Sequence, residues 1–223
     1  MTTSTQTPVD TWEMVFAHRI YRREFRILPG IIRAVADGDR ARSELVGAHL
    51  HRIAQALHHH HEAEDDLLWP IMLQRVISPD AEIVLRMESQ HERLEGLLKR
   101  VDELNTDWRA TAAAQVRDDL ADVLAQASSA LDEHLSDEER DLLPLVPGNV
   151  SHEEWDALNT RARNGMAAKN PKTALVLFGF AIEDATPLEK QRIMADLPAP
   201  LRLVWRLLGR RMFVKARDEL RHG

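Results

Sequence analysis

The segment HHEAEDDLLWP, residues 60–70, recurs in outline 74 residues further along the chain as HLSDEERDLLP, residues 134–144. Both copies begin with a histidine, followed by a glutamate four positions later, an acidic residue five positions later, a leucine eight positions later and a proline ten positions later. In a helix, side chains four positions apart lie on the same face, one turn from each other. Each copy therefore predicts a helix that presents an imidazole and a carboxylate together and ends near its proline.

The sequence around these two copies predicts an all-α protein built on an up-down four-helix bundle. Asp-Gly-Asp at 37–39 and prolines at 70, 144 and 147 separate four long stretches with helical periodicity. We expect Ser78 to cap the third helix, with Pro79 in its first turn. Long helices joined by short connections are typical of a bundle. The expected helices span residues 10–36, 40–68, 78–105 and 109–143.

Each expected helix has one apolar stripe, and each stripe is interrupted by a histidine, in two cases with a glutamate one turn later. The interrupting residues are His18, then His60 and Glu64, then His91, then His134 and Glu138. Burying such groups without partners is unfavourable, and a metal centre would compensate for that cost. His18 and His91 are 73 residues apart, close to the spacing of the repeat, which indicates a duplicated hairpin with the site between its halves.

This pattern resembles the hemerythrin-like (HHE cation-binding) family over about the first 145 residues. The resemblance implies a hemerythrin-like bundle holding a non-haem centre of two iron ions with an oxo or hydroxo bridge. It also implies that the four stripe histidines are terminal ligands and that Glu64 and Glu138 bridge the metals. Imidazole and carboxylate ligands would also suit manganese or zinc. The pattern is similar to bacterial hemerythrin-like proteins implicated in oxygen, nitric oxide or peroxide responses.

Two further residues have alternative interpretations. Oxygen-carrying hemerythrins have a fifth histidine one turn after the third-helix histidine, and here that position is Glu95. Glu95 is either an additional ligand or a surface acid, and its identity argues against reversible oxygen carriage. Tyr21, on the His18 stripe, is either a core tyrosine with a bonded hydroxyl or a residue whose hydroxyl reaches the metals or a bound oxidant.

The remaining histidines are predicted to have no role in the site. His58, His59 and His61 leave the stripe that Leu57 and Glu64 define, so we expect them to form a solvated patch. Four others are expected to be ordinary surface or boundary residues. These are His49, His51, His152 and His222.

The composition excludes several classes of function. The chain of 223 residues has a net charge of −7 and 5% aromatic residues, which argues against nucleic-acid binding. It has no cysteine, so disulfides, thiolate metal sites and cysteine nucleophiles are excluded. Its longest apolar stretch, residues 174–182, is shorter than the about 20 residues that span a bilayer, and the N-terminal segment has no targeting signal. We therefore expect a cytoplasmic protein without a membrane span.

The C-terminal third predicts a helical extension. Residues 1–148 form the expected bundle domain, and residues 149–223 contain shorter helices, with capping-box patterns at Ser151 and Thr186. Its last helix, expected from about Pro200 to the end, is basic and amphipathic. We expect the extension to pack on the bundle, with a contact to a partner, a dimer mate or a membrane surface as the alternative.

The sequence thus supports two functional hypotheses. The first is a di-iron protein that binds or converts a small oxidant (O2, NO or H2O2) in a stress response, with an enzymatic peroxide- or NO-consuming activity left open. The second is a non-catalytic sensor of oxygen, redox state or iron, or a metal-responsive binding module. Turnover of peroxide or NO by the iron-loaded protein would separate them.

Overall fold

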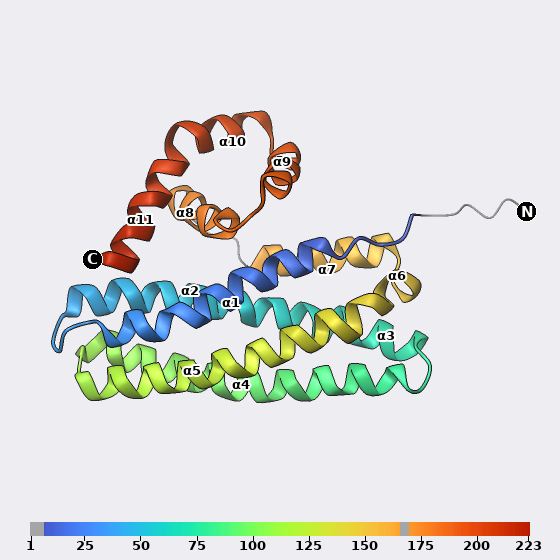
Figure 1. Ribbon diagram of the computed structural model, residues 1–223, viewed down its shortest axis with the longest axis horizontal. Helices are drawn as coiled ribbons and strands as arrows, with labels where there is room; N and C mark the ends of the chain where they lie inside the picture. The colour runs from blue at the N-terminus through green and yellow to red at the C-terminus, as the bar shows by residue number, and fades with distance from the viewer. Residues whose placement is uncertain (1–6, 166–169) are drawn as a thin grey trace, which may run out of the picture.

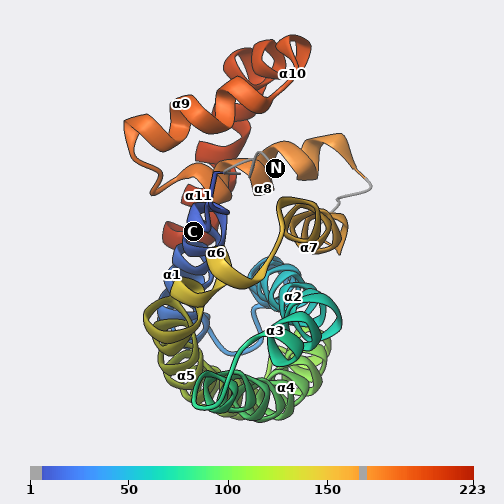
Figure 2. The same ribbon diagram turned by 90° about the vertical axis from the view of Figure 1, so that its right-hand side faces the viewer.

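The computed structural model describes residues 7–165 and 170–223, and within these ranges it contains helices and no strand. Four long helices lie side by side and form a ring when seen end-on (Figure 1, Figure 2). Their bounds are Trp12–Arg33 for α1, Arg40–Ala63 for α2, Asp80–Thr111 for α4 and Ala114–Asp137 for α5. Around the ring, α1 contacts α5, α5 contacts α4, α4 contacts α2, and α2 contacts α1. The prediction of an all-α four-helix bundle is confirmed.

The core of the bundle consists of the apolar stripes that the helical periodicity predicts. Phe25 and Leu28 of α1, Leu57 of α2, Leu94 of α4 and Leu131 of α5 are all fully buried. Burying one such side chain stabilises the fold by about 1.5–3 kcal/mol. These contacts fix the helices around the polar residues that interrupt the stripes.

The two repeat copies continue beyond α2 and α5 through π-helical segments, Glu64–Leu68 and Glu138–Leu142. In each segment, the backbone N–H five residues after the glutamate donates to the glutamate carbonyl. The residue that follows this donor is Pro70 or Pro144, which has no N–H to offer, and the wider turn lets the helix continue past it. The helical path then runs on through α3 (Trp69–Arg75) in the first copy, and through a 3₁₀ turn (Leu143–Leu145) and α6 (Val146–Asn149) in the second. The predicted end of the second helix at residue 68 is therefore wrong.

The turn between α4 and α5 also lies later than expected. Asn105, the predicted end of the third helix, is buried within α4 and donates from Nδ2 to the Gly47 carbonyl at 2.9 Å. The helix instead ends at Thr111, and Ala112 turns the chain with a left-handed φ of 54°. Because Asn105 bonds to α2, it supports the helix–helix contact instead of stopping the helix.

The capping prediction for Ser78 is wrong as well. The helix α4 begins at Asp80, Pro79 occupies the position before it, and no side chain caps its first turn. In contrast, both capping boxes of the extension are confirmed. Ser151 and Glu154 exchange side-chain and backbone hydrogen bonds at the start of α7, as do Thr186 and Glu189 at the start of α9.

The extension consists of α7, which lies along α2, and of α8 to α11, which lie over α1 and α2 (Figure 1, Figure 2). Its helices are α7 (His152–Gly165), α8 (Pro171–Ile182), α9 (Pro187–Asp196), α10 (Ala199–Val204) and α11 (Arg210–His222), the last two joined by a π-helical segment, Trp205–Gly209. Gly179 of α8 permits close packing, because a Cβ there would lie 2.2 Å from the Phe213 ring of α11.

A buried ionic cluster lies where the extension meets the bundle. Glu24 of α1 is fully buried and accepts hydrogen bonds from His49 Nε2 and from Arg23 Nε, both at 2.8 Å. Arg221 of α11 lies 3.5 Å from Glu24 and pairs with Glu183 at 2.8 Å. Although burial acts to raise the pKa of Glu24, His49 and Arg23 hold it below its ordinary value.

The position of His49 corrects a prediction. We expected a surface or boundary histidine, but His49 is 3% exposed. The ring of Phe180 in α8 covers it, with the two ring centroids 4.7 Å apart. The helical periodicity of the bundle could not show this burial, because it depends on a helix that follows more than 120 residues later in the chain.

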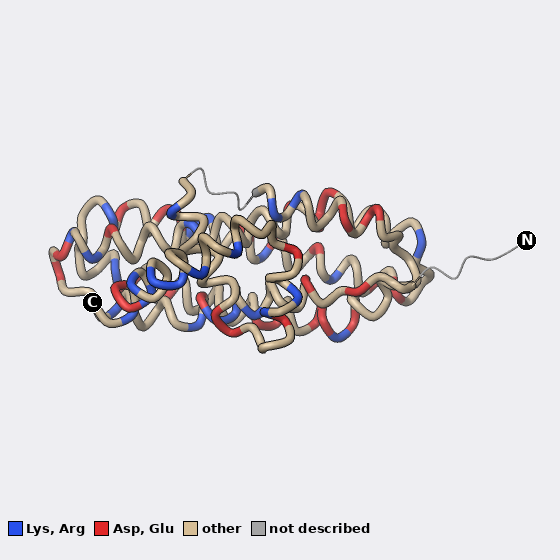
Figure 3. The backbone as a smooth tube through the Cα atoms, turned by 90° about the horizontal axis from the view of Figure 1, so that it is seen from above, with Lys and Arg blue, Asp and Glu red and all other residues tan. Residues whose placement is uncertain are grey.

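The surface of the molecule carries both signs of charge. Acidic and basic segments alternate along the helices (Figure 3). Four leucines near the junction of α10 and α11 are exposed, namely Leu201, Leu203, Leu207 and Leu208. In the part of the chain that the structure describes, no helix is both long and apolar enough to cross a membrane.

Candidate metal centre

The structure brings the six predicted ligands together in the middle of the bundle. His18, Glu64, His134 and Glu138 are fully buried, and His60 and His91 are 4% and 5% exposed. Each of the four bundle helices contributes one of the imidazoles, and the glutamates begin the two π-helical segments. The sequence therefore located the cluster, and the ligand role of each residue stays a prediction.

The two carboxylates each face two imidazoles. Glu64 lies with one oxygen 3.3 Å from His60 Nε2 and with the other 3.5 Å from His91 Nε2. Glu138 lies 3.3 Å from His18 Nε2 and 3.7 Å from His134 Nε2. Each carboxylate thus faces a pair of imidazoles that come from different helices, Glu64 with its two oxygens and Glu138 with the same oxygen for both.

The outer nitrogens of three of these imidazoles are held by neighbouring side chains. His18 Nδ1–H donates to Glu139 at 2.9 Å, and His91 Nδ1–H donates to Asp65 at 2.7 Å. His134 Nδ1–H donates to the Gln90 side-chain oxygen at 3.2 Å. Such bonds orient the ring and leave the Nε2 lone pair available, which is the usual arrangement of a metal-binding histidine.

Two of these supporting residues are shared features of the sequence repeat. Asp65 and Glu139 are the acidic residues that follow the histidines of the two copies by five positions. Asp65 of the first copy holds His91 of α4, and Glu139 of the second copy holds His18 of α1. Each copy therefore supplies a histidine, a glutamate and an acid that orients the lone histidine of another helix.

Most inner atoms of the cluster have no hydrogen-bond partner in the part of the chain that the structure describes. Among the described residues, Nε2 of His18 and His60 and both oxygens of Glu64 and Glu138 are buried without a hydrogen bond. His91 Nε2 and His134 Nε2 lie only 3.0 Å apart. Buried polar atoms without partners are costly, and nitrogens and carboxylate oxygens converging on one space are a donor set that fits metal cations.

Burial shifts the protonation of these groups towards their neutral forms. It raises the pKa of Glu64 well above its ordinary value and also raises the pKa of Glu138. It lowers the pKa of His60, His61 and His134 well below the ordinary value of histidine. Neutral imidazoles can bind a cation directly. The carboxylates bind a cation in their ionised form, which burial disfavours and which the positive charge of the cation would stabilise.

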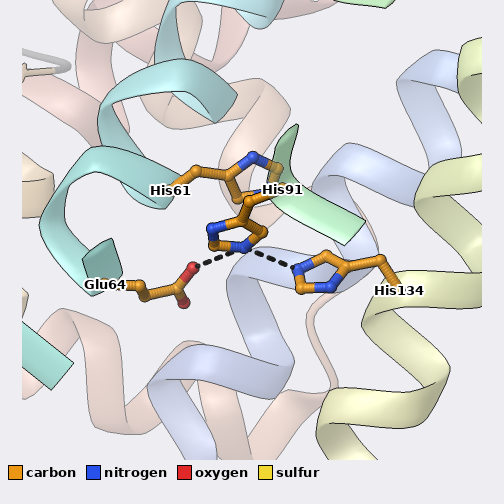
Figure 4. Close-up of side chains that lie close together, drawn as sticks. All are labelled: His61, Glu64, His91 and His134. Carbon is orange, nitrogen blue, oxygen red and sulfur yellow. Dashed lines mark hydrogen bonds and ion pairs between the residues drawn. The ribbon is translucent and has the colours of Figure 1, made fainter. Parts of the chain in front are cut away.

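His61 is a fifth imidazole of the cluster, and its predicted place in a solvated patch is wrong. It is 6% exposed and stacks on His91, with ring centroids 4.1 Å apart (Figure 4). Ligand atoms of His61, Glu64, His91 and His134 all lie within 4.8 Å of one another, and a second such group consists of His18, His60 and Glu64. Glu64 belongs to both groups.

The burial of His61 follows from the packing of α2 on both sides. The stripe that includes Ile53 and His60 meets α1, and the adjoining stripe that includes Ala54 and His61 is also buried. Both stripes have alternating steps of three and four, and they share Leu57 and Glu64. A prediction with one buried stripe for each helix leaves His61 outside the core, whereas α2 buries two stripes.

The other residues with alternative interpretations lie at the edge of the centre. Tyr21 is buried, its hydroxyl donates to the Ala56 carbonyl at 3.2 Å, and its ring centroid lies 5.3 Å from that of His60. Glu95 is exposed and lies in a surface recess together with His58 and His61, outside both candidate ligand groups of the described residues. Glu95 thus lies at the surface and Tyr21 in the core beside the cluster, and the role of each stays a prediction.

A helical bundle with a buried histidine–glutamate cluster defines a class of metal-binding proteins, and sequence comparison agrees. The family model described as "Hemerythrin HHE cation binding domain" matches residues 10–146. The chain therefore belongs to the hemerythrin HHE cation-binding family. No curated protein and no solved structure matches the chain.

Proposed function

We propose that the protein is a non-haem di-iron protein that binds or converts a small oxidant, O2, NO or H2O2, in an oxygen, nitrosative or peroxide stress response in the bacterial cytoplasm. The observation that supports this most is the pairing of buried carboxylates with inward-facing imidazoles. Glu64 and Glu138 would bridge two metals, and His18, His60, His91 and His134 would be their terminal ligands. His61 would add an imidazole beside His91 and His134.

Iron is the proposed metal because two adjacent irons supply a two-electron change, which reactions with small oxidants require. Mixed nitrogen and oxygen ligands would also accept manganese or zinc. The protein itself holds the imidazoles in one orientation through Asp65, Gln90 and Glu139. Leu57 and Leu131, three positions before His60 and His134, are fully buried in the apolar core.

The test begins with metal analysis of protein purified without a histidine tag. We expect about two metal ions per chain, mostly iron. The iron-loaded protein is then given hydrogen peroxide or NO, and consumption is followed against the metal-free protein. Zinc alone after expression in iron-rich medium, or a chain that retains no metal, would contradict the proposal.

A second candidate is a sensor without turnover. This alternative is favoured by the contact of α7 with α2 and with the π-helical segment that begins at Glu64, which connects the extension to the predicted ligands. An iron-loaded protein that consumes neither oxidant, but whose proteolysis in residues 150–223 changes with iron or oxidant, would establish the sensor in place of the enzyme.

A further inference from the structure

A cavity of about 410 Å³ lies between α1 and the extension. One wall is α1, and the facing walls come from α7, α8 and α9. The cavity therefore exists only because the extension packs beside the bundle, and nothing in the predicted metal site accounts for it.

The inner end of the cavity reaches the candidate metal centre. Tyr21 and His60 both contribute to its lining. These two residues are buried, and their ring centroids lie 5.3 Å apart. A molecule that fills the cavity would thus contact the imidazole that we propose as a metal ligand.

The walls of the cavity are apolar in its interior. Phe16 and Ile20 of α1 lie on one side, and Phe178 of α8 and Ile193 of α9 on the other. The charged lining residues are accommodated without a ligand, since Glu13 and Arg163 pair with each other at 3.4 Å and Asp196 is exposed. The interior therefore offers apolar contacts and no unpaired buried charge among its described lining residues, so a charged ligand would lose solvation there without compensation.

The size of the cavity excludes a diatomic gas or peroxide as its only occupant. A water molecule occupies about 30 Å³ in the liquid, and O2, NO and H2O2 are of similar size. Pockets of about 300–1,000 Å³ are typical of sites for small organic ligands. A space of about 410 Å³ is therefore large enough to hold a small organic molecule.

We propose that this cavity is a binding site for an uncharged, largely apolar organic molecule, whose inner end lies against Tyr21 and His60. Only the position of that inner end beside a metal rests on the proposed function. The protein would then bind a second class of ligand besides small oxidants. The extension would form the outer wall of that binding site.

The test uses N-phenyl-1-naphthylamine, an uncharged probe that becomes fluorescent in apolar surroundings, with full-length protein. We expect saturable binding of one probe per chain and displacement by 1-octanol, but little displacement by octanoate. Ala17→Trp in α1 and Ala162→Trp in α7 fill the cavity from opposite walls and should each weaken binding at least about tenfold. The matched control is Ala157→Trp, also in α7 but exposed and outside the lining, which should stay within about twofold of the unmodified protein.

Folding of each variant is checked by its helical circular dichroism, and the two filling variants on different helices keep the test valid should one of them fail to fold. Binding that is unchanged in both filling variants would overturn the inference. So would binding that disappears in Leu207→Ser, because the probe would then be on the exposed leucines of α10 and α11. Absence of any saturable brightening would overturn it as well.

The inner end is tested separately with cobalt(II)-loaded protein. Saturating 1-octanol should shift the visible spectrum of the cobalt in the unmodified protein and in Ala157→Trp, but not in Ala162→Trp. A spectrum indifferent to 1-octanol would contradict the contact at His60. Failure to bind cobalt or iron would contradict the proposed function alone, since probe binding by metal-free protein would still establish the cavity as a site.

Discussion

At the scale of single residues, the four consecutive histidines at positions 58–61 of α2 differ sharply in their exposure to solvent. His60 and His61 are buried in the cluster, whereas the side chains of His58 and His59 are 42% and 34% exposed and contact Glu62. Because neighbouring helical positions are rotated by about 100°, four consecutive residues sample almost the whole circumference. Individual substitutions in this run therefore separate ligands from surface residues.

The first prediction concerns the six ligands predicted from the sequence. His60→Ala and Glu138→Ala each remove an inward-facing donor, so metal content measured by plasma mass spectrometry should fall from about two per chain to below about one. His59→Ala is the control, because its imidazole bonds to Glu62 at 2.8 Å and faces away from the cluster. Equal losses in His59→Ala and His60→Ala would show that the cluster is not the metal site.

The second prediction distinguishes His61 as a ligand from His61 as a packing residue. His61→Ala should weaken binding of one of two metals at least about tenfold in a competition titration with a chelator. His61→Phe preserves the stacking on His91 but removes the nitrogen, and it should show the same loss. Full affinity in His61→Phe would mean that this ring only packs. His58→Ala serves as the matched exposed control.

At the scale of elements, the contact of α11 with α1 depends on Glu24. Glu24→Gln removes the charge between Arg23, His49 and Arg221, and should reduce the free energy of unfolding by about 3 kcal/mol near neutral pH. The pKa of Glu24 lies below its ordinary value of 4.5 in the folded protein, so this stabilisation is fully present above pH 4.5 and is lost progressively as the pH falls from there through the lower pKa of the folded protein. The difference between Glu24→Gln and the unmodified protein should therefore shrink in acid.

This third prediction is measured by urea denaturation of both proteins near pH 7 and near pH 4. Asp122→Asn is the control, since Asp122 pairs with Arg33 at the surface and such pairs contribute little. A difference that is constant between the two pH values would show that Glu24 acts through its shape and not its charge.

The same scale shows why element boundaries were harder to predict than elements. Pro70 and Pro144 are strong helix-stop signals, and they predict helix ends at residues 68 and 143. The π-helical turn that begins at each glutamate changes the hydrogen-bond pattern before the proline, so the helix continues. Both copies of the repeat contain this π-helical turn. The repeat predicts that the two copies share a backbone path, but not that this path includes a π-helical turn.

At the scale of the whole molecule, the bundle surrounds groups that would destabilise it without a cation. Glu64 and Glu138 have raised pKa values because of burial, and their oxygens have no hydrogen bonds within the described residues. As a fourth prediction, removing the metals with a chelator should lower the thermal midpoint by about 10 °C or more. Differential scanning calorimetry with and without added iron measures this, and a midpoint that does not respond to metal would contradict it.

The periodicity of single helices was sufficient to predict the bundle and six residues of the cluster. It could not predict His61 or His49, whose burial depends on a second packed neighbour, α4 in one case and α8 in the other. Nor could it place the extension, because the basic amphipathic pattern of the last helix suits a protein contact and a lipid surface equally. Spacing identifies the face of a helix, whereas the number of partners around that helix is a property of the tertiary structure.

The indole of Trp69 lies at the edge of the candidate metal centre. Trp69 Nε1 donates at 2.8 Å to Asp65, which also accepts from His91, and the rings of Trp69 and His91 lie 5.4 Å apart. The chain therefore contains its own optical reporter.

As a fifth prediction, iron or cobalt should quench the tryptophan emission in proportion to occupancy, while diamagnetic zinc should shift it with much less quenching. Trp69→Phe should abolish most of the change, and a response that persists in this variant would assign it to another tryptophan. Occupancy of the centre could then be followed in real time without any added dye.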